Sequence, residues 1–161
     1  MISFQSSPSA NPVLGSQDFG EWHFVHLSLL QEIPPFVRRI AEEMASLGYP
    51  DRDIFGVRLA LEECLVNSIR HGHLCDPEKV VLIRFSVTDE RVLLSIEDEG
   101  PGFDPSSIPD PTASENLGNP NGRGLFLMKM FMTWVHFNEP GNCVTLCKCR
   151  SEKPARAEVS A

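Results

Sequence analysis

Apolar residues recur at steps of three and four in two stretches of the chain, which predicts two amphipathic helices. These helices are expected over about 34–47 and 51–71, and the glycine after each suits a helix end. Asp51 or Asp53 can cap the second helix. The apolar stripes are Phe36, Val37, Ile40, Met44 and Leu47 in the first helix, and Ile54, Val57, Leu61, Leu65 and Ile69 in the second.

Runs of β-prone and apolar residues predict strands on both sides of this helical pair. The expected strands are 22–30, 80–88, 91–97, 134–138 and 143–150. The first suits a sheet edge, and the other four pair as two hairpins. A short apolar helix is expected over 123–131, after a proline-rich loop over 103–121. A loop this long inside a compact domain is usually functional or mobile.

The order of elements is therefore β-α-α-β-β-loop-α-β-β. It predicts an α+β fold, a two-layer sandwich with a mainly antiparallel mixed sheet and helices on one face. At 161 residues the chain is expected to form one domain, over 21–150. Residues 1–20 are rich in Ser, Pro, Asn and Gly and are expected to form a flexible leader, with 151–161 as a flexible tail.

Charge and composition narrow the function classes. The formal net charge of −8 disfavours a direct nucleic-acid binder, which needs a basic surface. No signal peptide is visible, and no apolar run approaches the ~18 residues of a membrane span. Five cysteines, an odd number without an export signal, suggest free thiols in a reducing cytoplasm.

A carboxylate and an amide lie one turn apart in the second helix. Glu63 and Asn67 project from one side of the helix, away from the apolar stripe. Arg70 and His71 lie on the same side and could reach phosphate oxygens. An amide oxygen suits Mg²⁺, and a neighbouring carboxylate can orient or deprotonate a hydroxyl near a metal-bound phosphate. Taken alone, the same pattern is also that of an ordinary solvated helix face.

Two glycine-containing segments add complementary chemistry. Asp98 ends a strand and can accept a hydrogen bond from an exocyclic amine such as that of adenine, and Gly100 and Gly102 let the backbone approach a flat ring. An acidic β-turn is the equally simple alternative. The second segment opens a helix, where free backbone N–H groups form a phosphate cradle, although a flexible hinge has the same composition. It consists of Gly122, Arg123, Gly124 and Leu125.

Taken together and in this order, the three segments resemble the N, G1 and G2 boxes of the GHKL (Bergerat-fold) ATPases. The matching stretches read RLALEECLVNSIRHG at 58–72, EDEGPGFD at 97–104 and GRGLFLM at 122–128. The resemblance is closest to the anti-sigma-factor serine-protein kinases of bacterial stress and sporulation switches. It covers about 22–150.

The resemblance implies a role for each matching residue. Asn67 would bind Mg²⁺, Glu63 would be the general base for a substrate serine, and Asp98 would bind the adenine of ATP. Residues 103–121 would form the ATP lid, and the glycines at 122 and 124 would hold phosphates.

The resemblance also implies partners: a STAS-domain anti-anti-sigma protein as substrate, a sigma factor as target, and a homodimer as a compatible assembly. Sensor histidine kinases share the boxes, but this chain shows no helix pair bearing a phosphoacceptor histidine. Gyrase-like and chaperone members need further domains. A non-catalytic, ATP-gated binding module remains the alternative, and Glu63 favours a kinase over it.

Several other reactive or apolar residues are given structural interpretations. Cys143, Cys147 and Cys149 share a strand without a second zinc-spaced cluster, and Cys64 lies in a helix interior. His71 and His73 follow a helix end, where capping or solvation is the common role. The expected core residues near the last helix are Phe126, Met128, Met130, Phe131 and Trp134.

Overall fold

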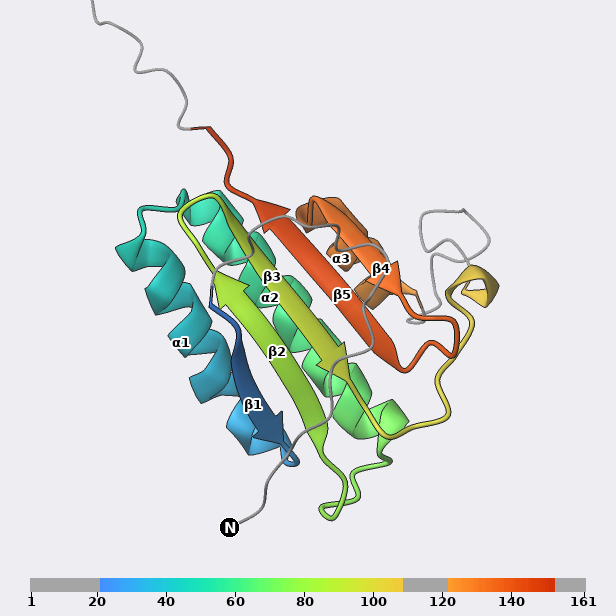
Figure 1. Cartoon of the computed structure of the whole chain (residues 1–161). Coiled ribbons are helices and arrows are strands. Elements are labelled where there is room, and N and C mark those ends of the chain that lie inside the picture. The colour runs from blue at the N-terminus through green and yellow to red at the C-terminus, as the bar shows by residue number, and fades with distance from the viewer. Residues whose placement is uncertain (1–20, 109–121, 153–161) are drawn as a thin grey trace, which may run out of the picture.

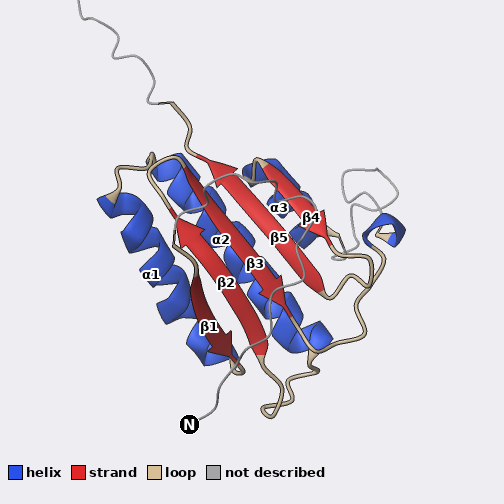
Figure 2. Cartoon of the chain, viewed as in Figure 1, coloured by secondary structure: helices blue, strands red, loops and turns tan. Residues whose placement is uncertain are grey.

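A computed structural model describes residues 21–108 and 122–152. Its helices all lie on one face of a five-stranded sheet, as Figures 1 and 2 show. The strands are β1 (His23–Leu27), β2 (Val81–Val87), β3 (Arg91–Glu97), β4 (Trp134–Phe137) and β5 (Cys143–Cys149). The helices are α1 (Ile33–Ser46), α2 (Asp51–Asn67) and α3 (Arg123–Phe131). Short 3-10 turns occupy Leu30–Glu32 and Pro105–Ser107.

The predicted α+β sandwich is confirmed. The sheet order is β1-β2-β3-β5-β4, with β1 at one edge as expected. Every pairing between the described strands is antiparallel, so the parallel component of the expected mixed sheet is not seen in this part of the chain. None of the described helices is long and apolar enough to cross a membrane.

The core lies between the sheet and the two long helices. Phe85, Leu94 and Leu146 stand side by side on β2, β3 and β5 and are fully buried. The predicted stripes of α1 and α2 cover them, and only Leu47 and Ile54 of those stripes are partly exposed. Burial of this shared face is the main force that holds the layers together.

The helix ends follow the sequence in part. Gly48 has a φ of +78°, the left-handed conformation expected of a glycine after a helix. The expected cap of α2 by Asp51 or Asp53 is wrong, because Pro50 holds the N-cap position and no side chain caps the helix. Asp53 is instead fully buried, and its carboxylate bonds to Ser151 rather than to the start of the helix.

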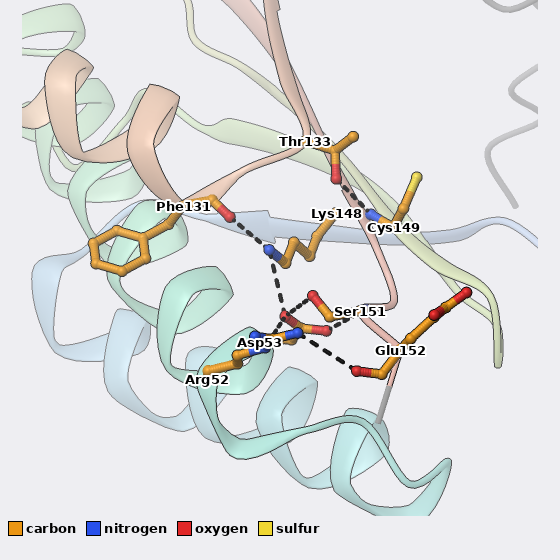
Figure 3. A network of polar contacts seen from close by, with 8 residues as sticks. All are labelled: Arg52, Asp53, Phe131, Thr133, Lys148, Cys149, Ser151 and Glu152. Atoms are coloured by element: carbon orange, nitrogen blue, oxygen red, sulfur yellow. Dashed lines mark hydrogen bonds and ion pairs between the residues drawn. The ribbon is translucent and has the colours of Figure 1, made fainter. Parts of the chain in front are cut away.

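Asp53 joins α2 to the end of β5, as Figure 3 shows. Its carboxylate accepts hydrogen bonds from the Ser151 backbone N–H (2.7 Å) and hydroxyl (2.8 Å), and lies 3.4 Å from the Lys148 ammonium. The same ammonium donates to the Phe131 carbonyl at the end of α3 (3.0 Å). Burial raises the pKa of the Asp53 carboxyl, but these hydrogen bonds and the ammonium outweigh burial and lower it below its ordinary value.

The expected core cluster near α3 is only partly buried. Met128 is buried, and Phe131 and Trp134 are half-buried, but Phe126 and Met130 are exposed. The prediction that all five belong to the core is therefore wrong for Phe126 and Met130. Helix α3 has only nine residues and packs mainly on α2, so a single face of it is covered.

Candidate functional site

The last turns of α2 carry the first predicted segment. Glu63 and Asn67 are both half-buried, and the Asn67 amide Nδ2 donates to Glu63 Oε1 at 3.3 Å. Helix α2 then widens into a π-helical turn over Ser68–Gly72, a feature common at functional sites. Arg70 and His71 lie on this turn and are exposed.

The start of α3 lies against Glu63. Gly122 is the N-cap of α3, with a φ of +88°. A Cβ atom at Gly124 would overlap Glu63 Oε1, so the glycine backbone and the carboxylate are in direct contact. Arg123 is exposed and Leu125 is half-buried in the same turn. The structure thus brings the first and third predicted segments together.

Close packing of α2 and α3 produces this contact. The two helices run in opposite directions: Gly56 of α2 meets Phe131 at the end of α3, and Cys64 lies further along opposite Met128. A Cβ at Gly56 would come within 3.0 Å of Phe131, so glycine permits the approach. Burial raises the pKa of the Cys64 thiol, which keeps it protonated and argues against a nucleophilic role.

Asp98 lies at the end of β3, against the end of the π-helical turn. Its Oδ1 accepts a hydrogen bond from the Gly100 N–H at 2.8 Å. A Cβ at Gly72 would lie 2.6 Å from the Asp98 carboxyl carbon, and one at Gly100 would lie 2.6 Å from the Gly72 carbonyl oxygen. The glycines at 72 and 100 therefore let the two segments touch. Figure 1 shows the ends of α2 and β3 side by side.

The turn between β4 and β5 contacts the loop after β3, which carries Asp98, from the other side. The Asn142 carbonyl accepts from the Asp98 N–H at 2.9 Å, and its amide Nδ2 donates to the Asp98 carbonyl at 3.1 Å. Asn138 Nδ2 in turn donates to Asn142 Oδ1 at 2.8 Å. Gly102, with a φ of +76°, packs so closely on the Pro140 carbonyl that a Cβ would overlap it.

These asparagines were not predicted as site residues. The sequence places Asn138 at the end of a strand and identifies 139–142 only as a hairpin turn, because a Pro-Gly-Asn turn looks the same whether or not its tip meets another loop. The interpretation of His73 as a capping or solvated residue is also wrong. Its side chain is fully buried, and its Nε2 accepts a hydrogen bond from the Glu99 N–H at 3.0 Å.

A separate groove of about 410 Å³ lies between α1 and α2. Its lining residues are Pro34, Val37, Arg38, Ala41, Glu42, Ala45, Arg58 and Glu62. None of the predicted site residues is among them, so the candidate site is defined by the contacts between the three segments. Of the predicted lid, residues 109–121 lie outside the described residues.

The three predicted segments thus meet around the end of α2. The sequence profile of the histidine kinase-like ATPase domain matches residues 27–148, most of the chain. The chain belongs to this family. The match takes in every segment of the candidate site, from Glu63 to Leu125.

The chain is similar to curated proteins of Clostridium and Bacillus species. It is 29% identical to the anti-sigma F factor of Clostridium perfringens (strain SM101 / Type A) over 92 residues, which are 55% of this chain and 65% of that protein. It is 28% identical to the serine-protein kinase RsbW of Bacillus licheniformis over 114 residues, 65% of this chain and 69% of the relative. The kinase RsbW of Bacillus subtilis (strain 168) is 29% identical over 109 residues, 63% of this chain and 68% of that kinase. The match to the anti-sigma F factor thus spans slightly less than two thirds of its length.

Proposed function

We propose that this protein is a Mg-ATP-dependent serine/threonine-protein kinase and an anti-sigma regulatory factor. It would phosphorylate a STAS-domain antagonist and sequester a sigma factor, as a soluble protein of the cytoplasm with residues 21–150 as its kinase domain. The observation that carries the proposal is the contact of Glu63 with both Asn67 and Gly124, which joins a candidate base, a candidate metal ligand and a candidate phosphate cradle. The names of the relatives, anti-sigma factor and serine-protein kinase, support the same role.

Adenine would bind at Asp98. The carboxylate would accept a hydrogen bond from the exocyclic amine, and its Oδ1 is already oriented by the Gly100 N–H. Gly100 and Gly102 would shape the surrounding pocket, and residues 103–121 would form the lid. Asp98 is held between the end of α2 and the β4–β5 turn, and this fixed position suits a group that recognises adenine.

The phosphates and the metal would bind between the ends of α2 and α3. Asn67 uses its Nδ2 to hold Glu63, which leaves its amide oxygen available as a hard, neutral ligand that fits Mg²⁺. Mg²⁺, when bound there, would neutralise part of the negative charge of the phosphates. Backbone N–H groups at the start of α3 would hold the phosphates. The further candidates for phosphate contact are Arg70, His71, Gly122, Arg123, Gly124 and Leu125.

Glu63 would act as the general base. As the serine hydroxyl oxygen of the substrate bonds to the γ-phosphorus, the bond from that phosphorus to the bridging oxygen breaks and ADP leaves. The Glu63 carboxylate would accept the hydroxyl proton. Its contacts with Asn67 and Gly124 would hold the carboxylate beside the reacting groups, so the proton has a fixed acceptor.

Intact-mass spectrometry tests the proposal. The protein is mixed with candidate STAS-domain proteins and Mg-ATP, and a gain of one phosphate on the partner is expected. Glu63→Gln is expected to bind nucleotide but to lose transfer by about 100-fold or more, because general-base catalysis commonly contributes ~10²–10⁴. Glu62→Gln is the matched control, since Glu62 is the exposed neighbour outside the site, and should transfer normally. Normal transfer by Glu63→Gln would remove the base assignment. Partner binding that depends on ATP without any transfer would favour a non-catalytic module.

A further inference from the structure

Residues 72 and 73 make three contacts with the loop that carries Asp98. The Gly72 α-carbon lies against the Asp98 carboxyl group, and the Gly72 carbonyl lies against the Gly100 α-carbon. The third contact is the hydrogen bond from the Glu99 N–H to His73 Nε2, at 3.0 Å. Of the three, this is the one made by a side chain, so it depends on the identity of the residue.

This hydrogen bond completes the fixing of both peptide groups around Asp98. The peptide group before Asp98 is held through its N–H, which donates to the Asn142 carbonyl. The peptide group after Asp98 is held through its carbonyl by Asn142 Nδ2 and through the Glu99 N–H by His73. Because the two flanking peptide planes define φ and ψ of Asp98, they also fix the direction in which its side chain leaves the backbone.

The backbone of His73 is itself held in place. Its N–H donates to the Ser68 carbonyl at 2.9 Å, and its carbonyl accepts from the Asp76 N–H at 3.0 Å. Leu74 and Cys75 then follow with φ values of +54° and +58°, a conformation that costs non-glycine residues roughly 1 kcal/mol or more each. The imidazole is thus presented from a tightly constrained segment rather than from a loose loop.

One nitrogen of the imidazole has no hydrogen-bond partner in the part of the chain that the structure describes. Because Nε2 accepts from Glu99, the hydrogen of the neutral ring is assigned to Nδ1, and this atom is buried without a hydrogen bond among the described residues. An apolar side chain of similar size at position 73 would avoid the cost of this unsatisfied donor, but it could not accept the hydrogen bond from the Glu99 N–H. The bond to Glu99 is therefore what the histidine adds at this position.

We propose that His73 is a positioning residue of the nucleotide site: it fixes the Asp98 carboxylate and thereby selects a purine that carries an exocyclic amine. This inference rests on the proposed function, in which Asp98 receives adenine. A carboxylate held in one orientation favours an amine donor and repels a carbonyl oxygen at the same ring position. A carboxylate free to turn away would discriminate less.

The test compares ATP with inosine triphosphate, which has a carbonyl oxygen in place of the amine. Dissociation constants for both are measured by calorimetry, and each variant is also melted. Wild type is expected to bind ATP about 10- to 100-fold more tightly, the range of a hydrogen bond to a charged group. His73→Leu removes the acceptor of the Glu99 N–H and should lower the ratio by about 3-fold or more, since the peptide group after Asp98 then keeps only its bond to Asn142. His73→Gln, whose Oε1 can reach the Glu99 N–H, should keep the wild-type ratio.

The ratio separates positioning from stability. A variant that is only less stable weakens both nucleotides equally and keeps the ratio, so a wild-type ratio in His73→Leu would overturn the inference. If His73→Leu does not fold, His73→Asn replaces it, because its shorter amide reaches only as far as Nδ1. Equal binding of the two nucleotides by wild type would overturn both the inference and the adenine role of Asp98. No binding of either by wild type would refute the proposed function itself.

Discussion

Replacement of Gly72 by alanine tests the contact that places Asp98. Gly72 does not have a positive φ, so alanine fits its backbone and the effect comes from the added methyl group alone. That methyl carbon would lie 2.6 Å from the Asp98 carboxyl carbon and Oδ1, and 2.8 Å from Oδ2. Ordinary contact begins near 3.4 Å, so the carboxylate must move by roughly 0.8 Å.

A shift of this size is expected to weaken ATP binding strongly. A displacement of about 1 Å can cost up to ~100-fold at a site that depends on orientation. Loss of a hydrogen bond to a charged group costs roughly 1.5–3 kcal/mol, or about 10- to 100-fold in affinity. Gly72→Ala is therefore expected to raise the dissociation constant of Mg-ATP by at least about ten-fold.

Calorimetry of Mg-ATP binding, together with thermal unfolding, measures the effect. Gly48→Ala is the control for a glycine replacement that lowers stability outside the candidate site. Gly48 has a φ of +78° and lies at the end of α1, where an added Cβ would lie 3.4 Å from Arg150. It should lose roughly 1–2 kcal/mol of stability and bind ATP normally. Wild-type affinity in Gly72→Ala would refute the placement of adenine at Asp98.

Three further predictions concern the rest of the molecule. Asp53→Asn breaks a buried ion pair and should lower the free energy of unfolding by roughly 3 kcal/mol in urea titrations, whereas the exposed Asp51→Asn should change it by less than about 0.5 kcal/mol. Because the folded-state pKa of Asp53 is lowered, its carboxylate contributes stability to wild type above the unfolded pKa of about 3.9, and this contribution is lost as the pH falls through the folded value; an equal acid response in Asp53→Asn would contradict this. Gly124→Ala displaces the Glu63 carboxylate and should slow phosphotransfer by about 10-fold or more in a single-turnover assay, with thermal stability as the control. Maleimide labelling of the native protein should modify two exposed thiols first, and fast labelling of all five would show that the buried thiols are accessible. The fast thiols are Cys75 and Cys149, and the slow ones are Cys64 and Cys147, whose pKa values are raised by burial.

The sequence predicted the layers of the fold because each depends on local periodicity. The stripes of α1 and α2 and the alternation in β2 give the strand and helix types without knowledge of their neighbours. The failed cap at Asp53 shows where local rules end. An aspartate near a helix start is a good cap in isolation, but here Lys148 and Ser151, almost a hundred residues later, hold it in the interior.

The candidate site was predicted in its parts and not in its supports. Glu63, Asn67 and the glycines are visible because their chemistry and spacing are distinctive. Asn142 and His73 are not, because a turn asparagine and a histidine after a helix have many ordinary roles. Their importance appears only when Asn142, in the β4–β5 turn, and His73, just after the π-helical turn, are seen to hold the peptide groups around Asp98.

The central claim, a magnesium-dependent ATP site at the end of α2, is tested most directly by calorimetric titration of ATP into wild type and Asn67→Ala, each with and without magnesium. Wild type is expected to bind more tightly when magnesium is present. Asn67→Ala should lose this increase, by about 10-fold or more, and keep the metal-free affinity. Absence of binding in wild type, or an unchanged magnesium response in Asn67→Ala, would contradict the account.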